Sequence, residues 1–215
     1  MNKRRILVVE DHPIFRLGLR ELINQEEDLE VCAESDDIAG ALAEIPKSRP
    51  DLVIVDLSLK GRSGIELIKE IRDRHAKLPI LVVSMYDEAL YAERALAAGA
   101  RGYVMKQEAS DSIAQALRCV LDGRFYLSTA MTTSLLGRLA GAEKPGSSDP
   151  IDRLTDRELE VFRMIGQGLT TGEIASKLYL SAKTIGTYRE RIKEKLNLKT
   201  ARELTVQAMR WSGGG

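Results

Sequence analysis

Five polar residues in the first half of the chain lie at or just after the ends of short apolar runs. They are three carboxylates, a hydroxyl and an ammonium: Glu10, Asp11, Asp56, Ser84 and Lys106. Clustered carboxylates repel one another unless a cation lies between them, and oxygen ligands are those that Mg²⁺ prefers. A lysine nearby supplies a point charge for phosphate. This set, in this order, indicates phosphoryl transfer onto an aspartate.

The runs before these residues read as strands of a parallel sheet. Residues 52–55, before Asp56, are apolar without alternation, which is typical of a strand buried on both faces. Ligands bind in open parallel sheets at the carboxyl ends of the strands, so we expect the five side chains to meet at that edge. Alone, an aspartate at a strand end would equally well cap the next helix or turn.

Five such strands alternate with five helices over the first 121 residues. The first helix is predicted to end near Asn24, the third to open with a capping box at residues 63–66, and the fifth to cover residues 109–121. Because each crossover is right-handed, this order predicts a doubly wound α/β fold with a five-stranded parallel sheet. A further helix is expected over residues 128–140, with an apolar side made of Met131, Leu135, Leu136 and Leu139.

Residues 1 to about 125 resemble a receiver domain of a bacterial two-component response regulator. The resemblance rests on the acidic pair, Asp56, Ser84, Tyr103, Lys106 and Gly64. It implies that Asp56 is the phosphoacceptor, that Lys106 pairs with a phosphoryl oxygen, and that Ser84 and Tyr103 form the switch. It also implies that Mg²⁺ is held by Glu10, Asp11, Asp56 and the backbone carbonyl of Ser58. Lys60 departs from the pattern, since receivers often have proline at this position.

The charge of the chain changes along its length. Residues 1–140 carry 19 basic and 22 acidic side chains, whereas residues 151–215 carry 12 and 8. Residues 181–200 hold six of those basic side chains and two acidic ones. A basic second half favours a nucleic-acid partner. Between the halves, residues 141–150 are rich in Gly, Pro, Ser and charge and have no apolar face, which predicts a linker.

The second half is predicted to be all helix. Three Thr-x-x-Glu capping boxes begin at Thr155, Thr170 and Thr200, and Ser181 is a good N-cap for a fourth helix. Only residues 178–180 separate the second and third of these helices, which predicts a helix-turn-helix inside a small four-helix bundle. The final helix carries Leu204, Ala208 and Trp211 toward its own bundle or toward a partner, as a candidate dimer contact.

The third of these helices has two different faces. Ile185, Tyr188, Ile192 and Leu196 form an apolar stripe at helical spacing. The opposite face carries short polar and charged side chains: Lys183, Thr184, Thr187, Glu190 and Arg191. Such a face suits a DNA major groove, although an ordinary solvated helix face has the same pattern. The basic excess and the short turn favour DNA.

Residues 154–211 resemble a LuxR-type helix-turn-helix. The matching runs are residues 154–158, 173–175 and 181–185. The resemblance implies that Gly186, Thr187 and Glu190 face base edges and that Lys183, Thr184 and Arg191 hold the DNA backbone. Tyr188 stands where the family usually has histidine; its hydroxyl could reach a phosphate, while its ring belongs to the core stripe. Together the two resemblances indicate the NarL/FixJ class of transcription regulators.

The resulting prediction is a phosphorylation-dependent DNA-binding transcription regulator. Its domains are a receiver (1–125), a linker helix with a flexible linker (126–150) and a DNA-binding domain (151–215). Expected partners are a sensor histidine kinase, double-stranded promoter DNA, a second copy when phosphorylated, and RNA polymerase. The protein is not expected to be an enzyme apart from the phosphorylation chemistry at Asp56.

Two alternatives stay open. A phosphatase of the haloacid dehalogenase type also phosphorylates an aspartate at a strand end, but it usually carries a second aspartate two residues later, where this chain has Ser58. The other alternative is a receiver-like domain that never uses its phosphate. Labelling by a small phosphodonor in the presence of Mg²⁺ distinguishes them.

Composition adds an expected location. No apolar run approaches the roughly 20 residues that span a bilayer. The basic N-terminus is followed by an apolar run too short for a signal peptide. Cys32 and Cys119 have no metal-site spacing and read as free thiols in a reducing compartment. A cytoplasmic protein without a membrane partner is expected.

Overall fold

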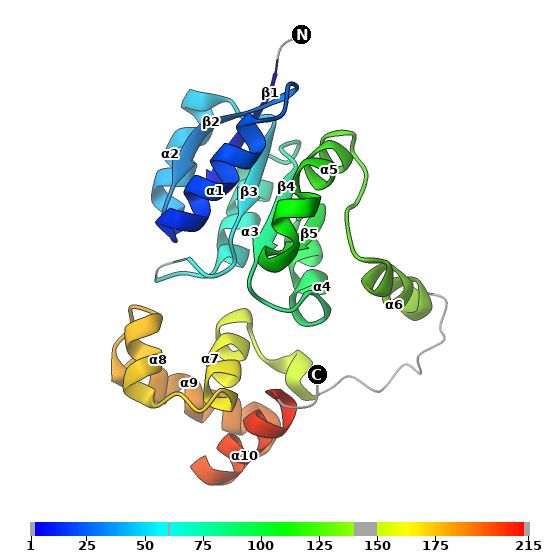
Figure 1. Cartoon of the computed structure of the whole chain (residues 1–215). Coiled ribbons are helices and arrows are strands. Elements are labelled where there is room, and N and C mark those ends of the chain that lie inside the picture. Colours follow the sequence, from blue (N-terminus) through cyan, green and yellow to red (C-terminus); the bar gives the residue numbers. More distant parts are fainter. Residues whose placement is uncertain (1–2, 60, 140–149, 213–215) are drawn as a thin grey trace. The chain divides into compact units, whose positions relative to one another are not determined.

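A computed structural model gives the fold and describes residues 3–59, 61–139 and 150–212. The chain divides into two compact units, residues 1–140 and 141–215. Lys60, the departure from the receiver pattern, lies outside the described residues, as does most of the predicted linker. Figure 1 shows the elements of each unit.

The first unit is built on a parallel sheet with the strand order β2-β1-β3-β4-β5 (Figure 1). The strands are β1 (Arg4–Val9), β2 (Leu29–Ser35), β3 (Leu52–Val55), β4 (Ile80–Ser84) and β5 (Gly102–Met105). The helices between and after them are α1 (Pro13–Asn24), α2 (Ile38–Ser48), α3 (Gly64–Arg74), α4 (Glu88–Ala98) and α5 (Ala109–Leu121). α1 packs with α5 on one face, and α2, α3 and α4 follow one another on the other. The predicted doubly wound fold is confirmed.

The middle of the sheet is apolar except for Ser84, because helices cover both of its faces. Every residue of β3 and β4 is buried, including Ser84 at the end of β4. Under α1 and α5, the core joins strand and helix side chains such as Ile54, Leu81, Leu19 and Ile113. This packed layer fixes the carboxyl ends of the strands and therefore the residues that follow them.

After α5 the chain returns to the outer edge of β5. The N–H of Tyr103 donates to the carbonyl of Tyr126 at 2.9 Å, and the N–H of Tyr126 donates to the carbonyl of Arg101 at 3.0 Å. A helix, α6 (Thr129–Leu139), then follows as predicted. Its apolar side was only partly predicted, because Met131 is buried whereas Leu136 is 60% exposed.

The second unit is a small helical bundle in its described part. It contains a short 3-10 turn, η2 (Pro150–Arg153), and the helices α7 (Asp156–Gly166), α8 (Thr171–Lys177), α9 (Ala182–Leu196) and α10 (Ala201–Ser212). A Cβ at Gly166 would lie 2.4 Å from the carbonyl oxygen of Ala208, so glycine allows α7 and α10 to approach closely. Leu204 and Ala208 are buried, and Trp211 packs on Phe162 with ring centroids 5.6 Å apart. This side of α10 therefore faces its own bundle.

The predicted caps are mostly confirmed. Thr155 and Thr170 form complete capping boxes, and Ser181 caps α9. At α3 the prediction was wrong in one half: Ser63 caps the helix, but Glu66 accepts a hydrogen bond from Arg62 at 2.8 Å. Arginine competes there because it offers a charged donor to the carboxylate.

Cys32 and Cys119 are both free thiols. Within residues 3–59, 61–139 and 150–212, no helix is long and apolar enough to cross a bilayer.

Candidate phosphoryl-transfer site and nucleic-acid interface

An acidic cluster forms where β1 and β3 end. Glu10 and Asp11 follow β1, Asp56 follows β3, and their carboxylate oxygens lie within 4.8 Å of one another and of His12. Asp56 and Glu10 are each only 1% exposed. Burial raises the pKa of Glu10 above its ordinary value, and the nearby Asp56 carboxylate raises it further, while Lys106 opposes both. This repulsion between buried carboxylates is what a cation would relieve.

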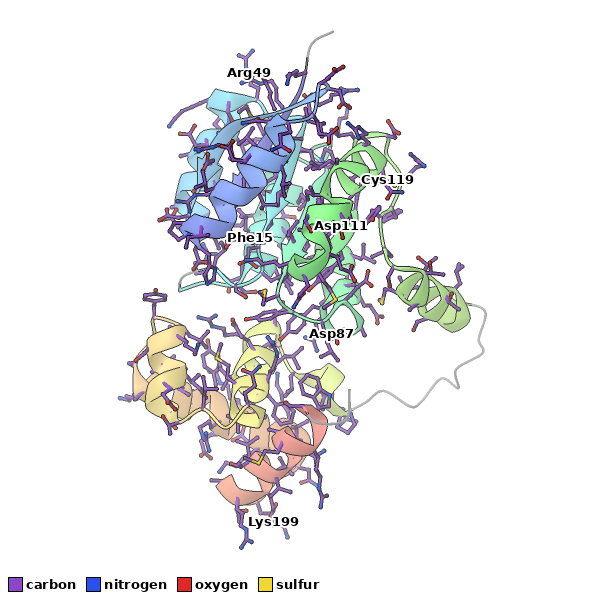
Figure 2. All side chains as sticks on the ribbon, in the orientation of Figure 1. Phe15, Arg49, Asp87, Asp111, Cys119 and Lys199 are labelled. Atoms are coloured by element: carbon purple, nitrogen blue, oxygen red, sulfur yellow. The ribbon has the colours of Figure 1, made fainter. Side chains whose placement is uncertain are left out.

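Lys106 reaches this cluster from the end of β5. Its Nζ lies 2.8 Å from Asp56 Oδ2 and 2.6 Å from Glu10 Oε2, and the side chain is 4% exposed. The same Nζ lies over the ring of Phe15, 4.5 Å from its centroid, where the aromatic face favours a cation. Figure 2 labels Phe15 on α1. One ammonium is thus held between two carboxylates and an aromatic ring.

Backbone hydrogen bonds fix the segment that follows Asp56. The N–H of Ser58 donates to Asp56 Oδ1 at 3.1 Å, and the N–H of Gly64 donates to the Leu57 carbonyl at 2.9 Å. A Cβ at Gly64 would lie 2.1 Å from the Asp56 carbonyl oxygen. Glycine is therefore required for α3 to begin this close to Asp56.

The predicted switch residues are linked through Tyr86. Its backbone N–H donates to Ser84 Oγ at 3.2 Å, and its carbonyl accepts the Tyr103 hydroxyl at 2.8 Å. Tyr103 is 2% exposed, so its ring already lies inward and needs no inward turn to become buried. Burial raises the pKa of Tyr103 well above its ordinary value, against the hydrogen bond with Ser84. Its hydroxyl therefore stays protonated and able to donate.

α9 presents the two faces that its sequence predicts. Ile185 and Ile192 are fully buried, while Tyr188 is half-buried. The opposite face is exposed at Lys183, Thr187, Glu190 and Arg191, with Thr184 and Gly186 half-buried. The turn before α9 is fixed by Arg157, which donates to the Leu178 carbonyl at 3.2 Å and to Glu160. Tyr179 in this turn has a φ of 53°.

Two family models match the two units. Residues 6–118 match the response regulator receiver domain, and residues 152–208 match the bacterial regulatory proteins of the luxR family. The chain is a response regulator of the receiver-plus-LuxR type. The fold and the class of protein predicted from the sequence are therefore confirmed.

Relatives of this response regulator match it over nearly its whole length. The oxygen regulatory protein NreC of Staphylococcus epidermidis is 34% identical over 211 residues, which cover 96% of this chain and 97% of NreC. A structure of the RcsB response regulator of Salmonella typhimurium has a TM-score of 0.68 and 28% identity, with 98% of each chain covered. Another, of RcsB bound to a promoter in the presence of the phosphomimetic BeF3−, has a TM-score of 0.62 and 29% identity, with 95% and 97% covered.

Some contacts in the site of this response regulator have no signature in the sequence. At the start of α1, Glu10 Oε1 accepts the His12 N–H at 2.9 Å, a contact that no motif in the sequence indicates. Phe15 and Tyr86 were not recognised as parts of the site. Phe15 lies at a core spacing on α1, and Tyr86 acts through its backbone, which no side-chain pattern reveals.

Proposed function

We propose that this response regulator accepts a phosphoryl group on Asp56 and thereby controls promoter binding by its second unit. The observation that carries the proposal is the buried Asp56 carboxylate, with the Lys106 ammonium at 2.8 Å and the Glu10–Asp11 pair beside it. In this proposal residues 1–125 are the receiver, 126–150 the linker region and 151–215 the DNA-binding domain.

The chemistry at Asp56 is a nucleophilic attack by one carboxylate oxygen on phosphorus, with departure of the donor group. Lys106 would move its charge from the carboxylates to an oxygen of the transferred group. Ser84 would donate its hydroxyl to another of these oxygens. A carboxylate nucleophile has no proton to lose, so this attack needs no base.

The donor set fits Mg²⁺, because carboxylate oxygens converge there, and burial together with repulsion from Asp56 raises the pKa of Glu10. Glu10, Asp11, Asp56 and the Ser58 carbonyl would hold the ion. When bound, Mg²⁺ supplies positive charge that offsets the negative charge of the transferring phosphoryl group.

A sensor histidine kinase is the proposed phosphodonor. Beside the site lies a groove of about 520 Å³ between α1 and the start of α5. Ile14 in its wall is 87% exposed, and Met85 is also exposed. An exposed apolar wall next to a reactive carboxylate suits a partner helix that delivers the phosphoryl group.

Promoter DNA is the proposed partner of α9. Gly186, Thr187 and Glu190 would face base edges, and Lys183, Thr184 and Arg191 would hold the backbone. Tyr188 is half-buried, which leaves its hydroxyl as a further phosphate contact. A homodimer would form upon phosphorylation. RNA polymerase is a further proposed partner, and the proposed location is the cytoplasm.

Asp56→Asn tests the proposal, because the amide has nearly the same shape but is a poor nucleophile. The purified full chain is treated with a small phosphodonor and Mg²⁺, and its intact mass is measured together with promoter affinity. Wild type should gain one phosphoryl group and bind its promoter more tightly. The variant should do neither, whereas Asp51→Asn, at the opposite end of β3, should behave as wild type. A phosphoryl group on the Asp56→Asn variant would refute the assignment.

A further inference from the structure

The strap that leads into α6, residues 124–128, is held at one end by the first residue of α4. Oε1 of Glu88 accepts the backbone N–H of Ser128 at 2.9 Å. Glu88 begins α4, and it is 9% exposed. Its carboxylate therefore makes a mostly buried, charge-assisted hydrogen bond to a different part of the chain.

Ser128 lies directly before α6. Its Oγ accepts the N–H of Met131 at 3.1 Å, and its carbonyl accepts the N–H of Thr132 at 2.9 Å. These two bonds make Ser128 the N-cap of α6. Glu88 thus holds the cap itself, and the adjoining Met131 side chain is 7% exposed.

The same strap is also bonded to the switch tyrosine. The N–H of Tyr103 donates to the Tyr126 carbonyl at 2.9 Å, while the Tyr103 hydroxyl donates to the Tyr86 carbonyl at 2.8 Å. Tyr86 and Glu88 belong to one short segment after Ser84, around the Asp87 that Figure 2 labels. Ser128 of the strap is therefore bonded to this segment directly, through Glu88, and Tyr126 is connected to it indirectly, through Tyr103.

We propose that Glu88 couples the segment of residues 84–88 to α6, so that phosphorylation of Asp56 changes how firmly α6 is held. This rests on the proposed function. When Ser84 moves toward a phosphoryl oxygen, the Tyr86 backbone bonded to it moves too, and Glu88 two residues later shifts with it. Leaving the buried Glu88 carboxylate without its hydrogen-bond donor costs free energy. Ser128 therefore either moves together with Glu88, or its hydrogen bond to Glu88 breaks and the start of α6 is held less firmly.

Hydrogen exchange on the full-length protein tests the coupling. Amide exchange of residues 128–137 is followed by mass spectrometry, with and without a small phosphodonor and Mg²⁺. Three variants are compared with wild type. Glu88→Ala removes the acceptor, Glu88→Gln keeps a neutral oxygen acceptor, and Glu27→Ala removes an exposed carboxylate elsewhere in the first unit.

The unphosphorylated Glu88→Ala variant should exchange the start of α6 about tenfold faster than wild type, because a cap held by one buried bond opens more often. Glu88→Gln and Glu27→Ala should stay near wild type, as should exchange in β3 of all variants. Phosphorylated wild type should differ from unphosphorylated wild type in α6, and this difference should vanish in Glu88→Ala.

Two results would overturn the coupling. One is equal α6 exchange in Glu88→Ala and wild type before phosphorylation. The other is unchanged α6 exchange in wild type whose intact mass shows a phosphoryl group. If the mass shows no phosphoryl uptake on wild type, the proposed function fails first, and the coupling that rests on it falls with it. The mass reading therefore tells the two failures apart.

Discussion

Gly64 determines how closely α3 approaches the backbone of Asp56. A Cβ there would lie 2.1 Å from the Asp56 carbonyl oxygen and 2.7 Å from the Leu57 Cα, and neither atom can move without shifting β3. Gly64→Ala should therefore destabilise the first unit by more than about 2 kcal/mol. Amide hydrogen exchange in β3 measures the stability of the first unit separately from that of the second.

Gly18 on α1 gives the matched control, since nothing lies within 4 Å of a Cβ built there. Gly18→Ala should stabilise α1 by about 0.5–1 kcal/mol, because alanine loses less backbone freedom than glycine. If Gly64→Ala and Gly18→Ala changed the stability of the first unit equally, the close approach of α3 at Gly64 would not contribute to that stability.

At the residue scale, side chains that act through their own charge were predictable. Asp56 and Lys106 were recognisable because each follows a strand of apolar residues, and they were found 2.8 Å apart. Contacts made by the backbone were not predictable. Tyr86 links Ser84 to Tyr103 through its N–H and carbonyl, which side-chain patterns do not reveal.

Among the helices, α7 and α9 are joined by a buried carboxylate. Glu158 Oε2 accepts from Lys195 Nζ at 2.6 Å and from the Thr155 N–H at 2.7 Å. Burial raises the pKa of Glu158, but these hydrogen bonds outweigh it and hold the pKa below its ordinary value of 4.5. A depressed folded-state pKa contributes stability that is present above the unfolded-state pKa and is lost as pH falls through the folded-state value.

Glu158→Gln should therefore destabilise the second unit by about 1.5–3 kcal/mol at neutral pH and reduce its acid sensitivity below about pH 4.5. The single tryptophan, Trp211, packs on Phe162 in this unit, so its fluorescence follows the unfolding. Glu194→Gln, an exposed position on α9, is the control. An acid profile of Glu158→Gln that matches wild type would contradict the role of the Lys195 pair.

On the exposed face of α9, some side chains are expected to set the affinity for DNA of any sequence, and others the sequence preference. Lys183→Ala should weaken binding to all DNA sequences and reduce the salt slope by about 0.9, the loss of one phosphate contact. Thr187→Ala should instead change which sequence is preferred. Salt titrations by fluorescence anisotropy measure both, with Lys47→Ala in the first unit as the charge control. An unchanged slope for Lys183→Ala would rule out its phosphate contact.

Elements were predictable where periodicity and caps agreed. α5 was expected over residues 109–121 and is found there, because Asp122 and Gly123 end its apolar stripe. The exposed Leu136 in α6 was not predictable from spacing, since a short helix with leucines on several sides offers more than one apolar face. The Tyr126 bridge involves a single residue and has no pattern to detect.

At the scale of the whole molecule, the proposed homodimer would bring two copies of α9 to the DNA. The RcsB relative has a structure with two dimers bound to two parallel DNAs. On α10, Leu204, Ala208 and Trp211 are turned to the bundle, while Val206 and Met209 are 40% and 49% exposed. Val206 and Met209 are therefore the better candidates for the contact of the proposed homodimer.

Met209→Asp should remove most of the avidity of the phosphorylated protein for DNA with two half-sites, a loss on the order of 10²-fold. Affinity for a single half-site should not change, and Met209→Leu should keep the avidity. Anisotropy titrations on the two DNAs provide the comparison. Equal losses on both would show that Met209 acts on folding or on DNA contact and not on pairing.

The return of the chain to β5 at Tyr126 also has a consequence for synthesis on the ribosome. Without this bridge the outer strand of the sheet would offer unpaired N–H and carbonyl groups, which readily recruit a strand from another molecule. Chains emerge from the amino end, so the edge stays open until residues beyond α5 have left the exit tunnel. Tyr126 lies outside residues 6–118, the segment that matches the receiver model. The nascent first unit is therefore expected to be prone to aggregation at this edge until Tyr126 has been synthesised and has paired with β5.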